Sequence, residues 1–373
     1  MRYLFINSVC GRRSTGKIVA NTCRELAEQG HECLVAYGRD DAAAQGFETF
    51  RIGGGTDTAL HILMTRTLDL HGFCSKAATR RLIARMEEYK PDVIWLHNLH
   101  GYYVNIELLF DAIKRMPGVK VFWTLHDCWA FTGHCAYFTA AKCDRWRIGC
   151  GSCPQRGAYP KTFGPDMSAR NWARKRRAFT GVGDLTLITP SRWLASLTRE
   201  SFLNEYPVRV VNNTVDTGVF RPTPSDVKTE LGIEGKHMVL GVAVGWEETK
   251  GMPDILMLRE RLDDSFVIVL VGSVAKRFLP LPKGIIGVPA TKDQTELARI
   301  YTAADVLINP THQDNYPTVN LEATACGTPV VTYDVGGSGE SAEPANVVAE
   351  GDVEAMAGRI RAICRSQAAD MNE

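Results

Sequence analysis

Two acidic residues eight positions apart, Asp314 and Glu322, are the first candidates for chemistry in this sequence. They lie in the stretch Pro310 to Val331, where a turn-prone segment is followed by a helical pattern from Val319 to Cys326. In an open α/β sheet, a helix that starts at such a place offers free N–H groups and a partial positive charge to an anion. The spacing predicts a phosphate site with a carboxylate, Glu322, one turn inside the helix to bind sugar hydroxyls. Two unrelated surface acids are the alternative.

A glycine-rich loop near the N-terminus, Gly11 to Lys17, is a second candidate. It matches the start of a P-loop, but Ile18 stands where the magnesium-binding Ser or Thr of a P-loop belongs. That departure argues against a nucleoside triphosphatase. The loop is better interpreted as a turn at a helix start, in which Gly16 leaves room for a phosphate or a sugar.

His126 and Asp127 directly follow a predicted strand, Val119 to Leu125. Doubly wound folds bind their ligands at the carboxyl ends of their strands, so this pair is predicted to be functional. A histidine that only packs or caps at this place is the alternative.

A cysteine-rich segment, residues 128–154, comes next. Its last two cysteines form a C-x-x-C pair, which is half of a zinc knuckle. In a reducing compartment, four of its thiols could hold a structural zinc ion, and free thiols or a redox pair are the alternatives left open. The four candidate ligands are Cys135, Cys143, Cys150 and Cys153.

The elements around these residues alternate between strand and helix, which predicts an α/β fold with parallel sheets. A chain of 373 residues is longer than a single hydrophobic core normally accommodates, so two Rossmann-like, doubly wound domains are expected. Residues 1–217 would form the first domain, with 128–154 as an insertion, and residues 233–373 the second. The proline-rich stretch 218–232 would link them, and one long helix is expected from Thr58 to Tyr89.

The net charge of +1 hides an asymmetry, because residues 1–180 carry 26 Lys and Arg against 16 Asp and Glu. This basic half, with its basic helix Ser168–Phe179, predicts an anionic partner such as a membrane surface or a pyrophosphate-linked substrate. Nucleic acid is not expected. No apolar run reaches the ~18 residues needed to span a bilayer, and the N-terminus resembles a strand rather than a signal peptide. A cytoplasmic protein, peripheral on the inner face of the plasma membrane, is therefore expected.

Several motifs together resemble the retaining, nucleotide-sugar-dependent glycosyltransferases of family 4, which have the GT-B fold. The resemblance covers nearly the whole chain. The segment that begins at His126, together with Ser14-Thr-Gly16, is similar to the branch that builds bacterial exopolysaccharides such as colanic acid. The motifs of the second half are Asn213-Thr-Val-Asp216 with Phe220-Arg-Pro222, Val244-Gly-Trp-Glu-Glu-Thr-Lys250-Gly251, Asp314-x7-Glu322 with Gly327-Thr-Pro, and Gly336-Gly337.

The resemblance implies two domains that face a central cleft, and it assigns the donor to the second one. Glu322 would bind the ribose hydroxyls and Asp314 the transferred sugar. Lys250 and backbone amides would hold the pyrophosphate; the amides are those around Pro317, Thr318 and Val319.

In the first domain, the resemblance implies that His126 hydrogen-bonds near the reacting sugar and that Gly16 lets its loop approach donor phosphate and acceptor. The substrates would be a nucleotide sugar and a lipid-linked or other oligosaccharide acceptor. No cofactor would be required for the chemistry.

Two positions depart from the family pattern. Asp314 stands where the family usually has Glu, and the usual Arg shortly before the pyrophosphate lysine is absent, since Gly245 and Thr249 occupy that neighbourhood. Arg277 is a candidate replacement. Two alternatives to a transferase therefore stay open: a GT-B sugar-nucleotide epimerase, and a non-catalytic module that binds nucleotide sugars or glycans.

Overall fold

The computed structural model describes residues 1–40, 42 and 46–370. By its internal contacts the chain forms two compact units, which divide between Asn212 and Asn213. The boundary expected after residue 217 lies close to this division. Residues 218–232, expected as a linker, contribute Phe220 and Val227 to the buried core of the second unit. No helix in the described part of the chain is both long and apolar enough to span a bilayer.

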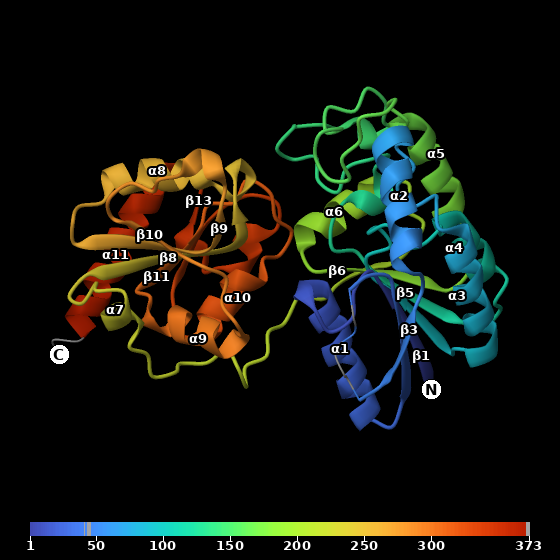
Figure 1. The fold of residues 1–373 in the computed structure, drawn as a ribbon, viewed down its shortest axis with the longest axis horizontal. Coiled ribbons are helices and arrows are strands. Elements are labelled where there is room, and N and C mark those ends of the chain that lie inside the picture. Colours follow the sequence, from blue (N-terminus) through green and yellow to red (C-terminus); the bar gives the residue numbers. More distant parts are fainter. Residues whose placement is uncertain (41, 43–45, 371–373) are drawn as a thin grey trace. The chain divides into compact units, whose positions relative to one another are not determined.

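Unit 1 contains a seven-stranded parallel sheet in the order β3-β2-β1-β4-β5-β6-β7, with helices on both faces (Figure 1). Alternate residues of its first strand explain this layering, because successive side chains of a strand point to opposite faces. Leu4 and Ile6 pack in the core on one face, and Tyr3 and Phe5 in the core on the other. The strands are β1 (Arg2–Asn7), β2 (Glu32–Tyr37), β3 (Glu48–Arg51), β4 (Val93–Leu96), β5 (Lys120–Thr124), β6 (Leu185–Thr189) and β7 (Val208–Val210).

The helices of unit 1 are mostly amphipathic and bury one side on the sheet. Among them, the basic helix α5 has the predicted bounds. The helices are α1 (Arg13–Glu28), α2 (Gly55–Leu68), α3 (Lys76–Tyr89), α4 (Ile106–Lys114), α5 (Ser168–Phe179) and α6 (Arg192–Glu200), with short 3-10 turns η1 (Trp129–Phe131) and η2 (Arg145–Arg147).

The prediction of one helix from Thr58 to Tyr89 is wrong, since α2 and α3 are separate helices. The chain turns through left-handed conformations at Asp69 (φ 53°), Gly72 (φ 87°) and Ser75 (φ 56°). Asp69 is completely buried there and accepts a hydrogen bond of 2.6 Å from His134. A tertiary contact that the local pattern does not reveal therefore interrupts the helix.

Unit 2 contains a six-stranded parallel sheet in the order β10-β9-β8-β11-β12-β13. Its central strand β8 again alternates, with Val239 in one core and Met238 and Leu240 in the other. The strands are β8 (His237–Trp246), β9 (Phe266–Val274), β10 (Ile285–Val288), β11 (Val306–Asn309), β12 (Val330–Tyr333) and β13 (Val347–Val348). The helices are α7 (Val227–Glu230), α8 (Met252–Arg261), α9 (Gln294–Ala303), α10 (Thr318–Ala325) and α11 (Val353–Asp370), with 3-10 turns η3 (Glu248–Lys250), η4 (Lys276–Phe278), η5 (Ser338–Ser341) and η6 (Pro344–Asn346).

Both units are thus doubly wound parallel α/β domains, as predicted. Strand order reverses beside β1 in unit 1 and beside β8 in unit 2. At such a point the loops after neighbouring strands diverge to opposite faces and leave space for a ligand.

Candidate functional site

In unit 2, the loops after β8 and β11 are packed tightly together. Gly251, which ends the turn after β8, has φ 77°, and a Cβ there would lie 2.1 Å from the carbonyl oxygen of Pro310. The backbone N–H of His312 donates to the carbonyl of Thr249 over 3.0 Å. Only glycine satisfies both the conformation and the close approach at position 251, so the Lys-Gly pair of the sequence motif has a local structural reason.

This packing brings Lys250 and Asp314 into contact. Lys250 Nζ lies 2.9 Å from Asp314 Oδ2, and the two side chains keep 38% and 21% of their surface exposed. The carbonyl of Asp314 accepts a 3.4 Å hydrogen bond from the N–H of Gly337, in the loop after β12. Residues from the carboxyl ends of three adjacent strands therefore meet at one place that solvent can reach.

Helix α10 starts directly after this loop, with Pro317 as its N-cap residue. The first amides of a helix lack partners within the helix and can bind an anion. Thr318 and Val319 provide such amides, whereas Pro317 has no N–H, so the expected contribution of an amide from position 317 is wrong. Asn320, which is completely buried, holds this end of α10 through hydrogen bonds of 3.0 Å from Asn309 and 2.9 Å to Ser341.

Glu322 lies on α10, one turn after these amides. Its Oε2 accepts a 2.9 Å hydrogen bond from the hydroxyl of Tyr301, a completely buried residue of α9. Burial, and then the charge of Glu322, raise the pKa of Tyr301 well above its ordinary value. Tyr301 thus remains a donor at any physiological pH and orients the carboxylate.

A partly exposed ionic cluster, with Asp254 as its buried member, supports the base of the same loop. His312 bridges two carboxylates, with 2.7 Å from Nε2 to Asp254 and 2.7 Å from Nδ1 to Glu350, and Tyr333 donates to Asp254 over 3.2 Å. Burial lowers the pKa of His312, but the hydrogen bonds and charges of Glu350 and Asp254 outweigh it and raise the pKa above its ordinary value.

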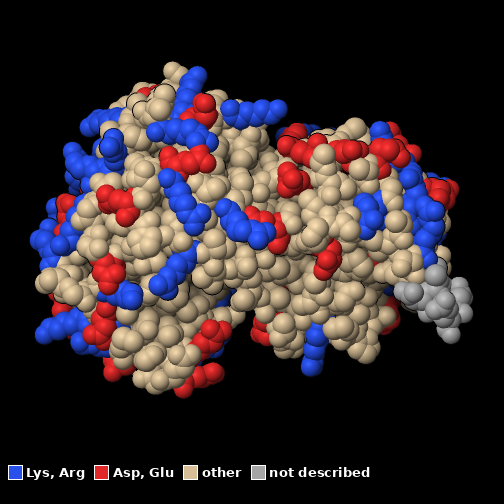
Figure 2. Space-filling model, turned by 180° about the vertical axis from the view of Figure 1, so that it is seen from behind, with Lys and Arg blue, Asp and Glu red and all other residues tan. Residues whose placement is uncertain are grey.

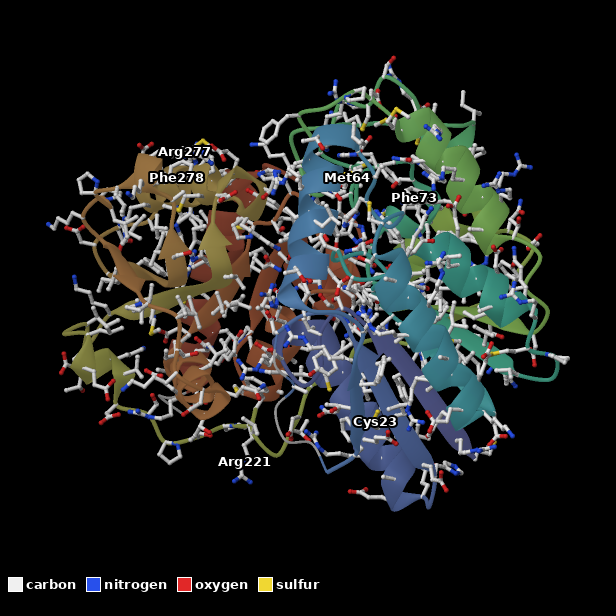
Figure 3. The ribbon with its side chains drawn as sticks, turned by 45° about the vertical axis from the view of Figure 1, so that its right-hand side comes forward. Cys23, Met64, Phe73, Arg221, Arg277 and Phe278 are labelled. Carbon is white, nitrogen blue, oxygen red and sulfur yellow. The ribbon has the colours of Figure 1, made fainter. Side chains whose placement is uncertain are left out.

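Arg277, the candidate replacement for the missing arginine, lies on η4 beside Phe278 (Figure 3). It forms an ion pair with Glu248, two residues before Lys250 in the same turn. The structure thus brings Arg277 to this turn, but its guanidinium is neutralised by Glu248. Lys250 remains the cation that contacts the acidic residue of the site.

In unit 1, His126 follows β5 and lines a pocket at the carboxyl ends of β4 and β5. Its Nε2 lies 3.0 Å from Nδ1 of His97, and the two rings are stacked. Burial lowers the pKa of His126 to about 4, so the ring is neutral at pH 7. Asp127 instead binds His100 over 2.7 Å and the N–H of Trp129 over 2.8 Å. His126 can therefore exchange hydrogen bonds with a ligand without carrying charge.

Gly16 lies within α1, which begins at Arg13, so it is part of the helix rather than of the turn before it. A Cβ at position 16 would lie 3.0 Å from the Val9 side chain and 3.3 Å from the Gly11 nitrogen. Close packing beneath the loop is thus one sufficient reason for this glycine, and its contact with a ligand stays a prediction.

The four predicted zinc ligands of unit 1 line a single small cavity; they are Cys135, Cys143, Cys150 and Cys153. All four are free cysteines. In the described part of the chain, no three His, Cys, Asp or Glu side chains are already arranged as a metal site.

The sequence analysis did not identify the residues that position the site through hydrogen bonds. Tyr301, Asn320 and His312 are each fixed by partners far away in sequence, and no local motif marks them. The position of His312 two residues before Asp314 was the only available hint.

Comparison with known proteins identifies the family of this chain. Residues 15–219 match the family described as Glycosyltransferase Family 4, and residues 242–366 match Glycosyl transferases group 1. The chain is 28% identical over 250 residues to WcaC of Escherichia coli K12, which is named as a colanic acid biosynthesis glycosyl transferase; the match covers 65% of this chain and 59% of WcaC. It is 34% identical over 148 residues to a D-inositol 3-phosphate glycosyltransferase of Segniliparus rotundus, covering 35% of this chain and 32% of that protein. The chain therefore spans less than two thirds of the length of these relatives.

Solved structures share the fold across nearly the whole chain. A sucrose-phosphate synthase of Thermosynechococcus elongatus matches with a TM-score of 0.70 and 15% identity, over 99% of this chain and 91% of that one. HepE of Anabaena, solved in complex with UDP, matches with a TM-score of 0.66 and 14% identity, over 98% of this chain and 91% of that one. The predicted GT-B fold is confirmed, and the chain belongs to glycosyltransferase family 4.

Proposed function

We propose that this protein is a retaining glycosyltransferase that moves a sugar from a nucleotide-sugar donor to a lipid-linked glycan in bacterial cell-surface polysaccharide synthesis. The observation that carries the proposal is the meeting of Lys250, Asp314, the N-terminus of α10 and Glu322 within unit 2. A cation, helix N-terminal amides and two carboxylates match the diphosphate, ribose and sugar of a nucleotide sugar.

The donor would be bound from its nucleoside end to its sugar end. Glu322, oriented by Tyr301, accepts hydrogen bonds from the ribose hydroxyls. The amides of Thr318 and Val319 and the ammonium of Lys250 hold the diphosphate. Asp314 binds hydroxyls of the transferred sugar, and donor binding replaces part of its contact with Lys250. HepE, solved with UDP and with UDP-glucose, supports a donor of this class.

The chemistry follows from the charge that develops when the sugar–phosphate bond breaks. Negative charge accumulates on the leaving diphosphate, and a fixed cation and a helix N-terminus stabilise it more in the transition state than in the ground state. Attack from the face that the diphosphate leaves would retain the anomeric configuration, and a diphosphate oxygen takes the proton of the acceptor hydroxyl. No protein nucleophile is assigned. Neutral His126 is proposed to hydrogen-bond the reacting sugar.

A membrane-bound acceptor is favoured by the surface of unit 1. Lys and Arg side chains are scattered over the face of this unit seen in Figure 2, with Asp and Glu among them. Helix α2 exposes Leu60 and Leu63, at 59% and 56%, and Phe163 is 73% exposed beside Arg66 and Lys161. Apolar side chains next to cations suit an anionic bilayer surface. Helix α5 contributes less positive charge to this surface than its sequence suggests, because its Lys175 is buried.

The experiment that tests the proposal is a thermal-shift screen with UDP-, GDP-, ADP- and dTDP-sugars, followed by transfer to a membrane lipid extract. A stabilising donor that is consumed only when extract is present, with equal amounts of nucleoside diphosphate and glycolipid formed, is expected. An altered free sugar would instead identify an epimerase. Donor binding without turnover would identify a binding module.

A further inference from the structure

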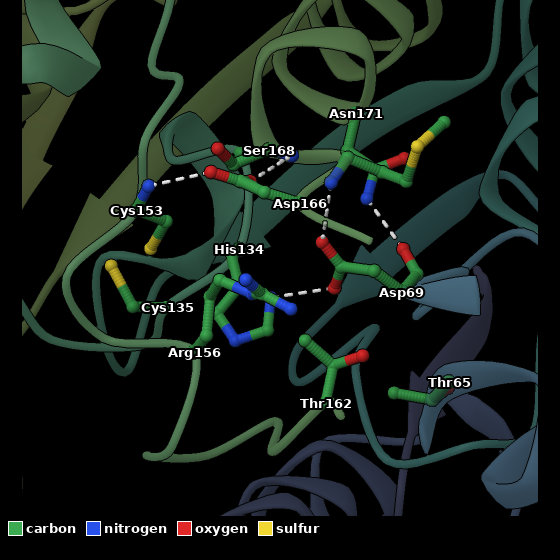
Figure 4. A network of polar contacts seen from close by, with 12 residues as sticks. Thr65, Asp69, His134, Cys135, Cys153, Arg156, Thr162, Asp166, Ser168 and Asn171 are labelled. Carbon is green, nitrogen blue, oxygen red and sulfur yellow. Dashed lines mark hydrogen bonds and ion pairs between the residues drawn. The ribbon is translucent and has the colours of Figure 1, made fainter. Parts of the chain in front are cut away.

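The cysteine-rich segment of unit 1 encloses a cavity of about 10 Å³, which is room for one water-sized guest. Four thiols that are up to 18 positions apart converge on it; they are those of Cys135, Cys143, Cys150 and Cys153. The sulfur atoms of Cys135 and Cys153 lie side by side in Figure 4. Apart from two short 3-10 turns, the segment has no regular structure of its own to explain this convergence.

Backbone N–H groups already point at two of the sulfurs. The N–H of Gly133 donates to Cys150 Sγ over 3.2 Å, and the N–H of Gln155 donates to Cys153. Such bonds stabilise a thiolate relative to a thiol. Between the two sulfurs, Cys150 (φ 58°) and Ser152 (φ 47°) adopt left-handed conformations that cost non-glycine residues about 1–2 kcal/mol each. These left-handed conformations turn the chain so that both Cys150 and Cys153 line the cavity.

The wall of the cavity carries a buried ring nitrogen without a partner. His134 Nδ1 is held by Asp69, which in turn accepts from the N–H of Met167 (Figure 4). His134 Nε2 is buried and has no hydrogen-bond partner in the structure. A buried polar atom left unpaired is costly, and this one belongs to a residue that lines the cavity.

A buried cation faces the same cluster. Lys175 is 1% exposed, and its ammonium donates to the carbonyls of Trp129 and Thr132, over 2.7 and 3.0 Å. Burial lowers the pKa of Lys175 to about 7, and the neighbouring groups that most oppose this shift are Cys150 and Cys135. A buried ammonium needs a compensating negative charge, and thiolates at these positions would supply it.

We propose that Cys135, Cys143, Cys150 and Cys153 bind one zinc ion as four thiolates. The four S–H protons pass to solvent as four S–Zn bonds form, and no group is oxidised or reduced. The complex carries a net charge of −2, which Lys175 partly balances. Because the described side chains are not yet arranged as a metal site, the sulfurs must turn inward on binding. Four protein ligands leave no open position, so the zinc is structural.

The zinc would brace the segment that follows His126, the residue proposed to hydrogen-bond the reacting sugar. That segment carries Trp129 and Ala130, which line the pocket of His126. A disulfide between Cys135 and Cys153 is the competing explanation, but it leaves Cys143 and Cys150 in the cavity without a role.

The test measures metal and thiols on the full-length protein, purified with a reductant and without chelators. We expect about one zinc per chain and four thiols that react with a thiol reagent only after the metal is removed. Replacement by Co²⁺ should give the intense sulfur-to-cobalt charge-transfer band of a tetrahedral thiolate site. Cys143→Ser and Cys150→Ser should each lose most of the zinc, whereas Cys74→Ser, a half-buried thiol outside the cavity, should keep it.

A folded wild-type protein without zinc, whose cobalt form lacks the thiolate band, would overturn the proposal. So would a Cys135–Cys153 disulfide found by mass spectrometry in protein that is alkylated at cell lysis, before any reductant is added. If the serine variants fail to fold, the stoichiometry and the cobalt spectrum of the wild type still decide the question.

Discussion

Replacing Lys250 by alanine separates the catalytic from the structural role of this residue. Its ion pair with Asp314 is short, at 2.9 Å, but 38% of the lysine side chain is exposed. Pairs that water reaches contribute about 0–1 kcal/mol to stability, so Lys250→Ala should change the free energy of unfolding by no more than that.

The effect of Lys250→Ala on turnover should be far larger. Removing a fixed donor from the developing charge of a transition state typically costs about 3–4 kcal/mol. At 1.36 kcal/mol per factor of ten, kcat should fall by about 10²–10³. Lys250→Arg should recover part of the loss, because the charge returns with a different geometry.

The assay is release of nucleoside diphosphate from the donor identified by the thermal-shift screen, with melting temperatures measured in parallel. Lys283→Ala is the matched control, because that lysine of unit 2 is 93% exposed and lies 4.0 Å from Asp264. An unchanged kcat in Lys250→Ala, with the protein folded, would refute the assignment of this cation to the leaving group.

Three further substitutions probe the structure behind the site. Tyr301→Phe removes the 2.9 Å hydrogen bond to Glu322, and a bond to a charged group is worth about 1.5–3 kcal/mol, so donor affinity measured by calorimetry should fall roughly tenfold or more. Gly251→Ala places a Cβ 2.1 Å from a backbone carbonyl, so we expect a destabilisation of at least about 1–3 kcal/mol in denaturant unfolding; an unaltered midpoint would contradict the packing described. Burial lowers the pKa of His312, but two neighbouring carboxylates outweigh burial and raise the pKa overall. The stabilisation that His312 contributes is therefore complete below its unfolded pKa of about 6.5, and it is lost as pH rises through the higher folded pKa. The wild-type protein should therefore lose more stability than His312→Ala on going from acidic to alkaline pH, and parallel curves would argue against the cluster.

The fold could be predicted largely from the sequence, because parallel strands buried on both faces give near-continuous apolar runs separated by helical periods. The candidate donor residues could also be proposed from the sequence, since Lys250-Gly251 and the acidic pair are local motifs, and the structure brings Lys250 and Asp314 into contact. Their binding of a donor stays a prediction. Gly251 shows why such a motif is informative: its positive φ and its contact with Pro310 allow no other residue.

What the sequence could not show are interactions between segments far apart in the chain. Asp69 breaks the predicted long helix because His134, 65 residues later, holds it. Lys175 appears as one more surface charge in a basic helix, yet it is buried against Trp129. Tyr301 lies 21 residues before the carboxylate that it orients. Each depends on tertiary packing rather than on local pattern.

The most direct test of the proposed function is transfer itself, followed by mass spectrometry of the lipid fraction and NMR of the new glycosidic bond. The purified protein would be incubated with the donor that stabilises it and with lipid-linked glycans from bacterial membranes. We predict one sugar added to the glycan, with the anomeric configuration of the donor preserved, and loss of this product in Glu322→Ala. Inversion at the anomeric carbon, or equal product from Glu322→Ala, would contradict the account.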